Sequence, residues 1–446
     1  MQDQLDEAPR TRKLKQELLE STIETLDKVS AKAEQTTSIS ATLLAANFRY
    51  AKAFLETGQF DKAIERYRKC LVLAEAEAAD KLARQEDHDS SQLNLASVQS
   101  TLGLLTAQQL HDPEAGIALC RKALEICDRL RSKPRSTTGI VSEEELAALQ
   151  DETRMKMASI LYAQGNPAAV LPLARRALEA RRDALRTDPG DPNLQWELSR
   201  SLKLVGETAF LLGDRAEGFA LYDECLTIQN ALVTAHPGVP PLEVALATTE
   251  GDYGDLHLRE GAFDAARPHH DEAVEILEGI VAQDAENVEA VQQLALAWYR
   301  RGQLARATGD AATAAANFER SLASRERLAD ADPANIALQI ERMLALAQCG
   351  KRAQALAIAG GLPADHDDRE MLLAIAKCAA VCAASSDGEE RRGNVDRAIA
   401  ALAQAVAAGY RDATTLRTDP DLAAVRDDPR YPSLELPVEE PPPPGI

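Results

Sequence analysis

The chain has 446 residues and a formal net charge of −21, with a sequence pI of about 4.9. A surface this acidic repels phosphate groups, which disfavours nucleic acid and anionic membranes as partners and favours basic or neutral proteins. Hydrophobic residues make up 45% of the chain but aromatic residues only 4%. Alanine and leucine must therefore supply most of the packing, which favours an all-α fold of closely packed helices.

The N-terminal third is predicted to hold an entry helix followed by two helical hairpins. Residues 11–34 place leucine, isoleucine and valine at spacings of three and four, which is typical of an amphipathic helix. We assign residues 1–40 to this entry segment, 41–131 to hairpins one and two, and 132–145 to a loop. Ser142 and Glu145 have the spacing of a capping box for the helix that follows the loop.

The first full hairpin begins at Leu44 and carries a pattern of small and large residues. Ala63 is the small residue where two helices cross, and a large residue beside it fills the remaining gap. Five positions match the tetratricopeptide repeat, which this segment resembles: Gly58, Phe60, Ala63, Tyr67 and Leu71. The resemblance implies an all-α, TPR-like α-solenoid, a right-handed superhelix of about eight antiparallel helix pairs.

Residues 146–335 repeat one hairpin four times at a spacing of 48 residues. The shared positions are the turn glycines Gly165, Gly213, Gly261 and Gly309, the small residues Ala177, Cys225, Ala273 and Ser321, and the prolines Pro189, Pro237 and Pro333. A period of this size marks a stacked repeat array rather than a single globular core. Since a plain tetratricopeptide repeat has 34 residues, the extra 14 predict longer helices that stop before the prolines.

The C-terminal part, residues 336–431, is predicted to hold further hairpins and a capping segment, followed by a disordered, proline-rich tail at 432–446. Its closing stretch resembles the end of the tetratricopeptide regions attached to planctomycete-type bacterial serine/threonine protein kinases. The residues that carry this resemblance are Gly409, Tyr410, Leu416, Asp419, Pro420, Asp421, Leu422, Arg426, Asp428 and Pro429. The opening residues 2–20 are similar to the start of the same regions.

The kinase domain of that family has no counterpart in this sequence, because the glycine-rich loop, the His-Arg-Asp and the Asp-Phe-Gly motifs are missing. We expect a protein without enzymatic activity. The N-terminus is polar and acidic, and the most apolar run, residues 372–384, contains Lys377 and is too short to span a bilayer. We expect a cytoplasmic location, or an extracytoplasmic one if the chain is a fragment of a membrane-anchored kinase.

No metal or cofactor is expected. The seven cysteines are scattered singly, which is not a disulfide framework. Cys378 and Cys382 are four apart on one helix but have no further ligand nearby, and core packing explains them better. Among the histidines of the fifth hairpin, His270 falls in a column of large buried residues, whereas His269 is expected to be exposed.

The positive functional signal is the surface lined by the first helix of each hairpin. Such extended concave surfaces bind peptides or partner helices. Counting back from the turn glycines gives the candidate partner-binding residues Lys203, Glu207, Phe210, Asp255, Arg259, Tyr299, Gln303 and Arg306. Capture of a chaperone's C-terminal carboxylate is disfavoured, because Glu207 stands where that mode of binding needs asparagine.

The sequence thus predicts a non-catalytic scaffold that binds a peptide or partner protein on its concave surface. The alternative is that the same surface is a regulatory or sensor region of a bacterial serine/threonine protein kinase, or of a protein that works with one.

Overall fold

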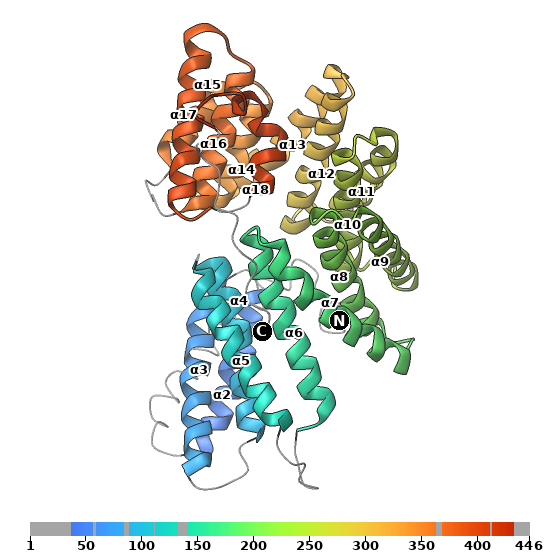
Figure 1. Cartoon of the computed structure of the whole chain (residues 1–446), viewed down its shortest axis with the longest axis vertical. Helices are drawn as coiled ribbons and strands as arrows, with labels where there is room; N and C mark the ends of the chain where they lie inside the picture. Colours follow the sequence, from blue (N-terminus) through green and yellow to red (C-terminus); the bar gives the residue numbers. More distant parts are fainter. Residues whose placement is uncertain are drawn as a thin grey trace. The chain divides into compact units, whose positions relative to one another are not determined.

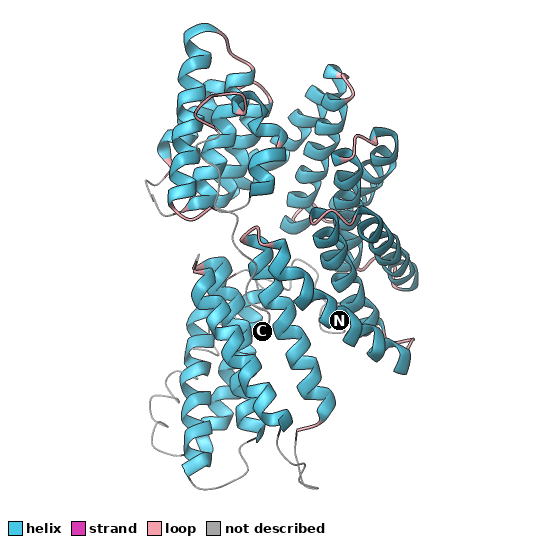
Figure 2. Cartoon of the chain, in the orientation of Figure 1, coloured by secondary structure: helices cyan, strands magenta, loops and turns pink. Residues whose placement is uncertain are grey.

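The computed structural model describes residues 37–56, 59–83, 89–110, 112–132, 141–362, 368–410 and 413–431. All regular elements in these residues are helices, and none is a strand (Figure 2). The helices are α2 (Thr37–Glu56), α3 (Phe60–Ala83), α4 (Asp89–Gln109), α5 (Pro113–Ser132), α6 (Glu143–Ala163), α7 (Pro167–Thr187), α8 (Pro192–Leu211), α9 (Arg215–Ala235), α10 (Pro240–Arg259), α11 (Phe263–Gln283), α12 (Val288–Ala307), α13 (Ala311–Ala331), α14 (Ile336–Gln348), α15 (Arg352–Gly361), α16 (Arg369–Ala384), α17 (Gly388–Ala407), α18 (Ala413–Thr418) and the 3₁₀ helix η2 (Pro420–Val425).

Consecutive helices from α2 to α17 form eight antiparallel hairpins within the described residues (Figure 1). The even-numbered helix comes first in each hairpin. This confirms the all-α helical-repeat solenoid with about eight hairpins. The helices of the four 48-residue units are 20 or 21 residues long, as the long period predicts.

The turns inside the hairpins explain the glycine column. Gly213, Gly261 and Gly309 have φ of +97°, +72° and +81°, a conformation that costs other residues free energy. Asp214 and Asp310 follow two of these glycines and cap the next helix, because each carboxylate accepts a hydrogen bond from a backbone N–H three residues on.

The second helices stop where the prolines predict. Helices α7, α9 and α13 end at Thr187, Ala235 and Ala331, immediately before the Asp-Pro, His-Pro and Asp-Pro pairs. Proline disfavours helical geometry in the residue before it, so the helix ends there. The second helix of the seventh hairpin is short, since α15 has only 10 residues.

The two helices of a hairpin cross at a glycine that lies under a large ring. Tyr222, His270 and Phe318 pack over Gly206, Gly254 and Gly302, respectively. A methyl group added at Gly302 would lie 2.6 Å from the Phe318 ring, so no larger residue fits without rearrangement. His270 is 1% exposed, which confirms its place in the column of large buried residues.

The chain divides into two compact units, one formed mainly by residues 1–163 and 167–194 and the other mainly by 195–446. The finer segment boundaries expected from the sequence stay predictions. Residues 11–34, Gly58, residues 133–140 and the tail at 432–446 lie outside the described residues.

The capping box at the start of α6 is present: the Glu145 N–H donates to Ser142 Oγ and the Ser142 N–H donates to a Glu145 carboxylate oxygen, both at 3.0 Å.

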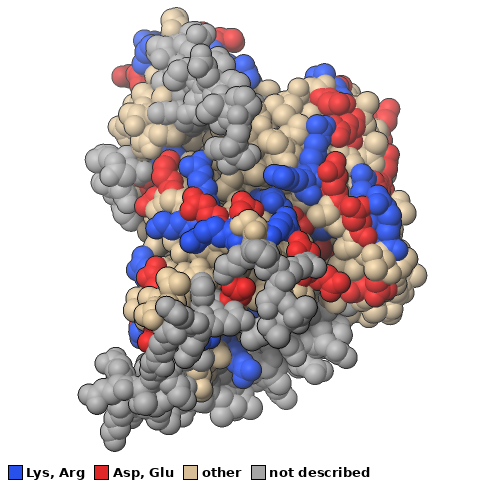
Figure 3. Space-filling view, turned by 60° about the horizontal axis from the view of Figure 1, so that its bottom comes forward, with Lys and Arg blue, Asp and Glu red and all other residues tan. Residues whose placement is uncertain are grey.

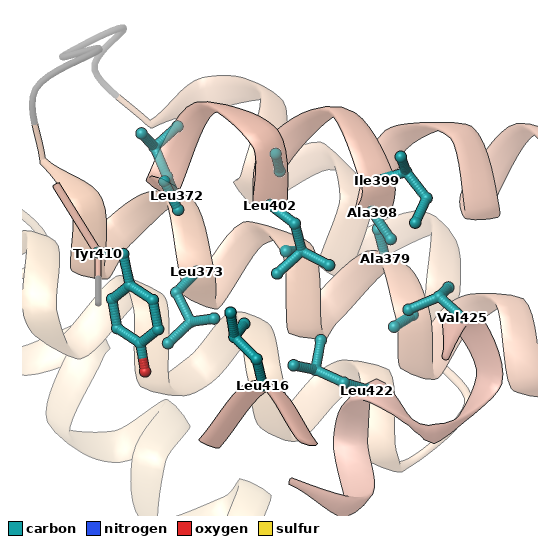
Figure 4. Packing of buried hydrophobic residues seen from close by; sticks show 14 residues of the cluster. Leu372, Leu373, Ala379, Ala398, Ile399, Leu402, Tyr410, Leu416, Leu422 and Val425 are labelled. Carbon is teal, nitrogen blue, oxygen red and sulfur yellow. The ribbon is translucent and has the colours of Figure 1, made fainter. Parts of the chain in front are cut away.

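The second unit closes with a compact apolar cluster. Leu422 and Val425 of η2 are fully buried against α16 and α17, and Tyr410 and Leu416 cover the neighbouring side chains (Figure 4). These contacts fix the position of η2 on the last hairpin. The polar side of the same short segment points to other helices, and it forms part of the site described next.

Candidate functional site

The first helices of hairpins four, five and six are joined by an ion network. Lys203 Nζ of α8 lies 2.5 Å from Asp252 Oδ2 of α10, and Arg300 of α12 pairs with Asp252 and, at 2.9 Å, with Asp255 Oδ2. Each bridge links one hairpin to the next. The network therefore ties together the helices on which the candidate residues Lys203 and Asp255 lie.

The network alters the acidity of its carboxyl groups. Burial raises the pKa of Asp252, but Lys203 and Arg300 outweigh it, so the pKa is lowered below the usual value of 3.8. Burial dominates at Asp255, whose pKa is raised although Arg300 lies beside it. Both signs of charge are interspersed among the described residues on the face drawn in Figure 3.

The candidate residues of hairpin six converge on a single carboxylate from the end of the chain. Asp421 of η2 is 7% exposed. Tyr299 OH donates to its Oδ2 at 2.8 Å, and the Nε2 atoms of Gln303 and Gln348 donate to its Oδ1 at 3.1 and 2.7 Å. Arg306 Nη2 lies 3.4 Å from the same Oδ1. Donors from two hairpins thus satisfy a carboxylate that lies 73 to 122 positions away in sequence.

A second carboxylate of the segment is bound in the same way. Asp419 Oδ2 lies 2.6 Å from Lys377 Nζ of α16, and Asp419 Oδ1 accepts the N–H of Asp421 at 2.9 Å. Arg426 donates to the carbonyls of Leu416 and Asp419. Burial, and next the Asp421 carboxylate, raise the pKa of Tyr299 well above 10, so this hydroxyl stays a donor throughout the neutral range.

The other candidate residues have different surroundings. Glu207 is half-buried, Arg259 is exposed, and Phe210 is 8% exposed and packs edge-to-face with Phe219 of α9.

Sequence reasoning missed Asp252, Arg300, Gln348, Lys377 and Asp421. The first two had a signal, since they occupy the same repeat position 48 residues apart and have opposite charges. We use the term first-helix surface for the polar residues Lys203, Glu207, Asp252, Asp255, Arg259, Tyr299, Arg300, Gln303, Arg306 and Gln348.

The histidines of hairpin five lie in two settings, and His270 borders the first-helix surface, since its Nε2 lies 3.7 Å from Asp255 Oδ1. His269 is part-buried rather than exposed, because its Nδ1 lies 2.7 Å from a Glu250 carboxylate oxygen and its ring stacks on His257. His270 is buried, and burial, with Arg300 next, lowers its pKa to about 3. The Cys378 and Cys382 side chains are buried between helices.

Metal ligands and membrane-spanning helices are both missing from the described residues. These residues contain no group of three or more histidine, cysteine, aspartate or glutamate side chains placed to hold a metal ion. None of their helices is both long and apolar enough to span a membrane.

Comparison with known proteins agrees with the fold. The family model "Tetratricopeptide repeat" matches residues 44–77. The apo form of the quorum sensor NprR from B. thuringiensis superposes with a TM-score of 0.52 at 11% identity, over 86% of this chain and 95% of that one. A thermophilic TPR protein of Thermus thermophilus is 22% identical, with a TM-score of 0.33 over 53% of this chain and 98% of that one.

A Rap protein complexed with competence and sporulation factor is 14% identical, with a TM-score of 0.43 over 90% of this chain and 97% of that one. No curated protein matches the chain in sequence. The family model thus covers one repeat, and the hairpin geometry shows a helical-repeat solenoid fold.

Proposed function

We propose that this chain is a protein-interaction scaffold that binds an extended segment of a partner protein on the first-helix surface. The observation that carries the proposal is that hairpins six and seven already bind a segment of this chain. Tyr299, Gln303, Arg306 and Gln348 already bind a short polypeptide segment through the side chain of Asp421. A surface with donors arranged for one peptide carboxylate has the chemistry of peptide recognition.

These donors add one hydrogen bond between hairpins six and seven, from Arg306 Nη1 to Gln348 Oε1 at 2.9 Å, but they are not the packing residues of the helix crossings. Packing is supplied by the buried small residues and rings at the crossings, such as Ala273, Ser321 and Phe318. Gln303, by contrast, is 6% exposed and directs its amide to a residue 118 positions away. A buried amide costs free energy unless it is hydrogen-bonded, and the Gln303 amide nitrogen has two partners, Tyr299 of its own helix and Asp421 of the bound segment.

Binding rather than catalysis also fits the state of three buried thiols. Burial raises the pKa of the Cys70 and Cys225 thiols to about 12 and of the Cys120 thiol to about 11, so these groups are protonated and poorly nucleophilic at neutral pH. The His269 ring bonds the carboxylate of Glu250, and this pair itself contains no hydroxyl or thiol.

The link to a serine/threonine kinase remains the second candidate. The segment bound at Tyr299 and Gln303 contains Asp419 to Leu422, which is part of the stretch that resembles the end of kinase-attached tetratricopeptide regions. On this proposal the surface reports partner binding to a kinase, in the same chain or in another. A reading frame upstream that encodes a kinase domain supports it, and its absence from the genome's neighbouring frames counts against it.

The test of partner binding compares matched charge reversals on the two kinds of helix. Arg259 is exposed on the first helix α10, and Arg267 is exposed on the second helix α11 of the same hairpin. Immobilised wild-type, Arg259→Glu and Arg267→Glu chains are mixed with lysate of the source cells, and retained proteins are quantified by mass spectrometry. We expect Arg259→Glu to lose a set of proteins that Arg267→Glu keeps. Equal retention by both variants contradicts the proposal.

A further inference from the structure

A difference between repeats explains why the segment that contains Asp421 binds at hairpin six of the first-helix surface. Gln303 of hairpin six corresponds, one and two periods of 48 residues earlier, to Asp255 and Glu207. Those two carboxylates repel another carboxylate, whereas the Gln303 amide donates to Asp421. Of these three, only the hairpin-six residue suits an acidic side chain, so a residue that varies between otherwise similar repeats favours hairpin six as the place where the segment binds.

The segment is held by two separable sets of contacts. Its apolar side, Leu422 and Val425, is buried against the last hairpin (Figure 4). Its acidic side, Asp419 and Asp421, reaches α12, α14 and α16 through side chains only. A cap for the last hairpin requires the apolar side. The acidic side adds recognition of two carboxylates spaced two residues apart, which is a chemical pattern that another polypeptide can present.

We propose that Tyr299, Gln303, Arg306, Gln348 and Lys377 form a recognition site for an acidic partner peptide with the pattern Asp-x-Asp-Leu, and that residues 419–425 occupy this site in the intact chain as an internal competitor. The inference rests on the proposed function and names its partner class. Five donors facing two carboxylates match an acidic segment, and the fully buried Leu422 shows where its aliphatic residue fits.

Because the internal segment occupies the site, binding of a partner peptide depends on release of the segment. A tethered ligand has an effective concentration of about the millimolar order, so a free peptide of similar affinity competes poorly until the segment leaves. A partner that presents several such motifs, or a change that detaches residues 413–431, would open the site. The intact chain is therefore expected to bind a free acidic peptide more weakly than a chain whose segment has been cut loose.

The test keeps every residue of the segment present. Residues 411–412 are replaced by a site for a specific protease, and the chain is studied before and after cleavage. The probe is a fluorescent peptide of residues 413–431, with an Asp421→Asn peptide as its control, and binding is read by fluorescence anisotropy. We expect the cleaved chain to bind the Asp421 peptide about 10- to 100-fold more tightly than the intact chain does, and the control peptide about tenfold or more weakly than the Asp421 peptide.

Two further arms separate recognition from simple capping. A Gln303→Glu chain, which carries the carboxylate of hairpin four at this position, is expected to reverse the preference and bind the Asp421→Asn peptide better than the Asp421 peptide. A reversal of preference cannot come from loss of folding. A Gly-Ser peptide that contains only Asp-Pro-Asp-Leu is expected to compete with the probe, whereas its Asn-Pro-Asn-Leu version is not.

Several results overturn the inference. Failure of the cleaved chain to exchange its segment, or equal binding of the Asp421 peptide and its Asp421→Asn control, makes the segment a permanent cap. If neither Gly-Ser peptide competes with the probe, the partner is not an acidic peptide with the pattern Asp-x-Asp-Leu. Dimers of the cleaved chain that depend on Asp421 assign the site to a second copy instead. Because no cellular partner enters these measurements, they can succeed when the Arg259→Glu test fails, and the two proposals are separable.

Discussion

Asp252 and Arg300 occupy the same position of successive 48-residue repeats, and they form an ion pair that bridges α10 and α12. Lys203 extends the bridge to α8 at 2.5 Å. Repeats that share their packing residues thus differ in charge at one position, and the difference becomes an attraction between neighbours. A second difference between repeats explains the position of Asp421, which binds hairpin six, where the Gln303 amide replaces the carboxylates of hairpins four and five.

Replacing Asp252 by asparagine is expected to destabilise the second unit by about 2 kcal/mol at pH 7, because Lys203 and Arg300 lose their shared, largely buried partner. Urea unfolding measures the change. Asp271→Asn, which removes the partner of Arg301 in an exposed pair, serves as the control and is expected to cost less than about 0.5 kcal/mol.

The same variant has a defined pH dependence. The folded pKa of Asp252 is lowered, so its ionised form stabilises the fold above the unfolded pKa of about 4, and the stabilisation is lost as the pH falls through the lowered value. Wild type and Asp252→Asn should differ in stability at pH 7, and the difference should be smaller at pH 3. A difference that is the same at both values would show that charge is not the cause.

Replacing His270 by phenylalanine copies hairpin six, where Phe318 fills the equivalent position. Both ring nitrogens of His270 are buried without a hydrogen-bond partner, although Nε2 lies 3.7 Å from Asp255 Oδ1 and Arg300 faces the ring. A larger apolar ring removes the cost of the two unsatisfied nitrogens. We expect His270→Phe to unfold at higher urea concentration than wild type at pH 7.5.

Acid should enlarge that difference. The pKa of His270 is about 3 in the folded protein against 6.5 for an unperturbed histidine, so the unfolded state binds a proton first and stability falls as the pH drops below 6.5. Between pH 7.5 and 5, the wild type should lose about 2 kcal/mol that His270→Phe keeps. Parallel losses in the two proteins would mean that His270 does not titrate in this way.

A pair of glycine substitutions tests the crossing of the helices. Gly302→Ala places a methyl group against the Phe318 ring and is expected to cost about 1–3 kcal/mol. Gly279→Ala lies within α11 with no atom near the added methyl group, so it should stabilise the fold by up to about 1 kcal/mol through helix propensity. Thermal unfolding of both variants checks the prediction, and a loss at Gly279 equal to that at Gly302 would point to the backbone rather than to the ring.

Much of the fold could be predicted from the sequence because its signals are local and repeated. The turn glycines, the Asp-Pro stops and the small residues at the crossings recur every 48 residues, and each acts through the backbone or through one neighbouring helix. Ser142 and Glu145 form their capping box for the same reason. Periodic, short-range features of this kind determine hairpins without knowledge of distant contacts.

The candidate site could be predicted from the sequence only in part. Counting from the turn glycines selected Tyr299, Gln303 and Arg306, which the structure brings together, but it gave no sign that Asp421 lies between them. That contact depends on where the chain end folds back, which periodicity does not encode. His269 was expected to be exposed, and the error came from its partner Glu250, which lies on the other helix of the hairpin.

The central claim is that the first-helix surface is where a partner lies. Its most direct test places the photoreactive residue p-benzoylphenylalanine at Arg259 on α10 or, in a second variant, at Glu278 on the second helix α11; both positions are exposed. Both chains are irradiated in cells and the cross-linked proteins are identified by mass spectrometry. The account predicts a discrete partner cross-linked from position 259 and not from 278. The same partner captured equally from both positions, or captured from 278 alone, would contradict it.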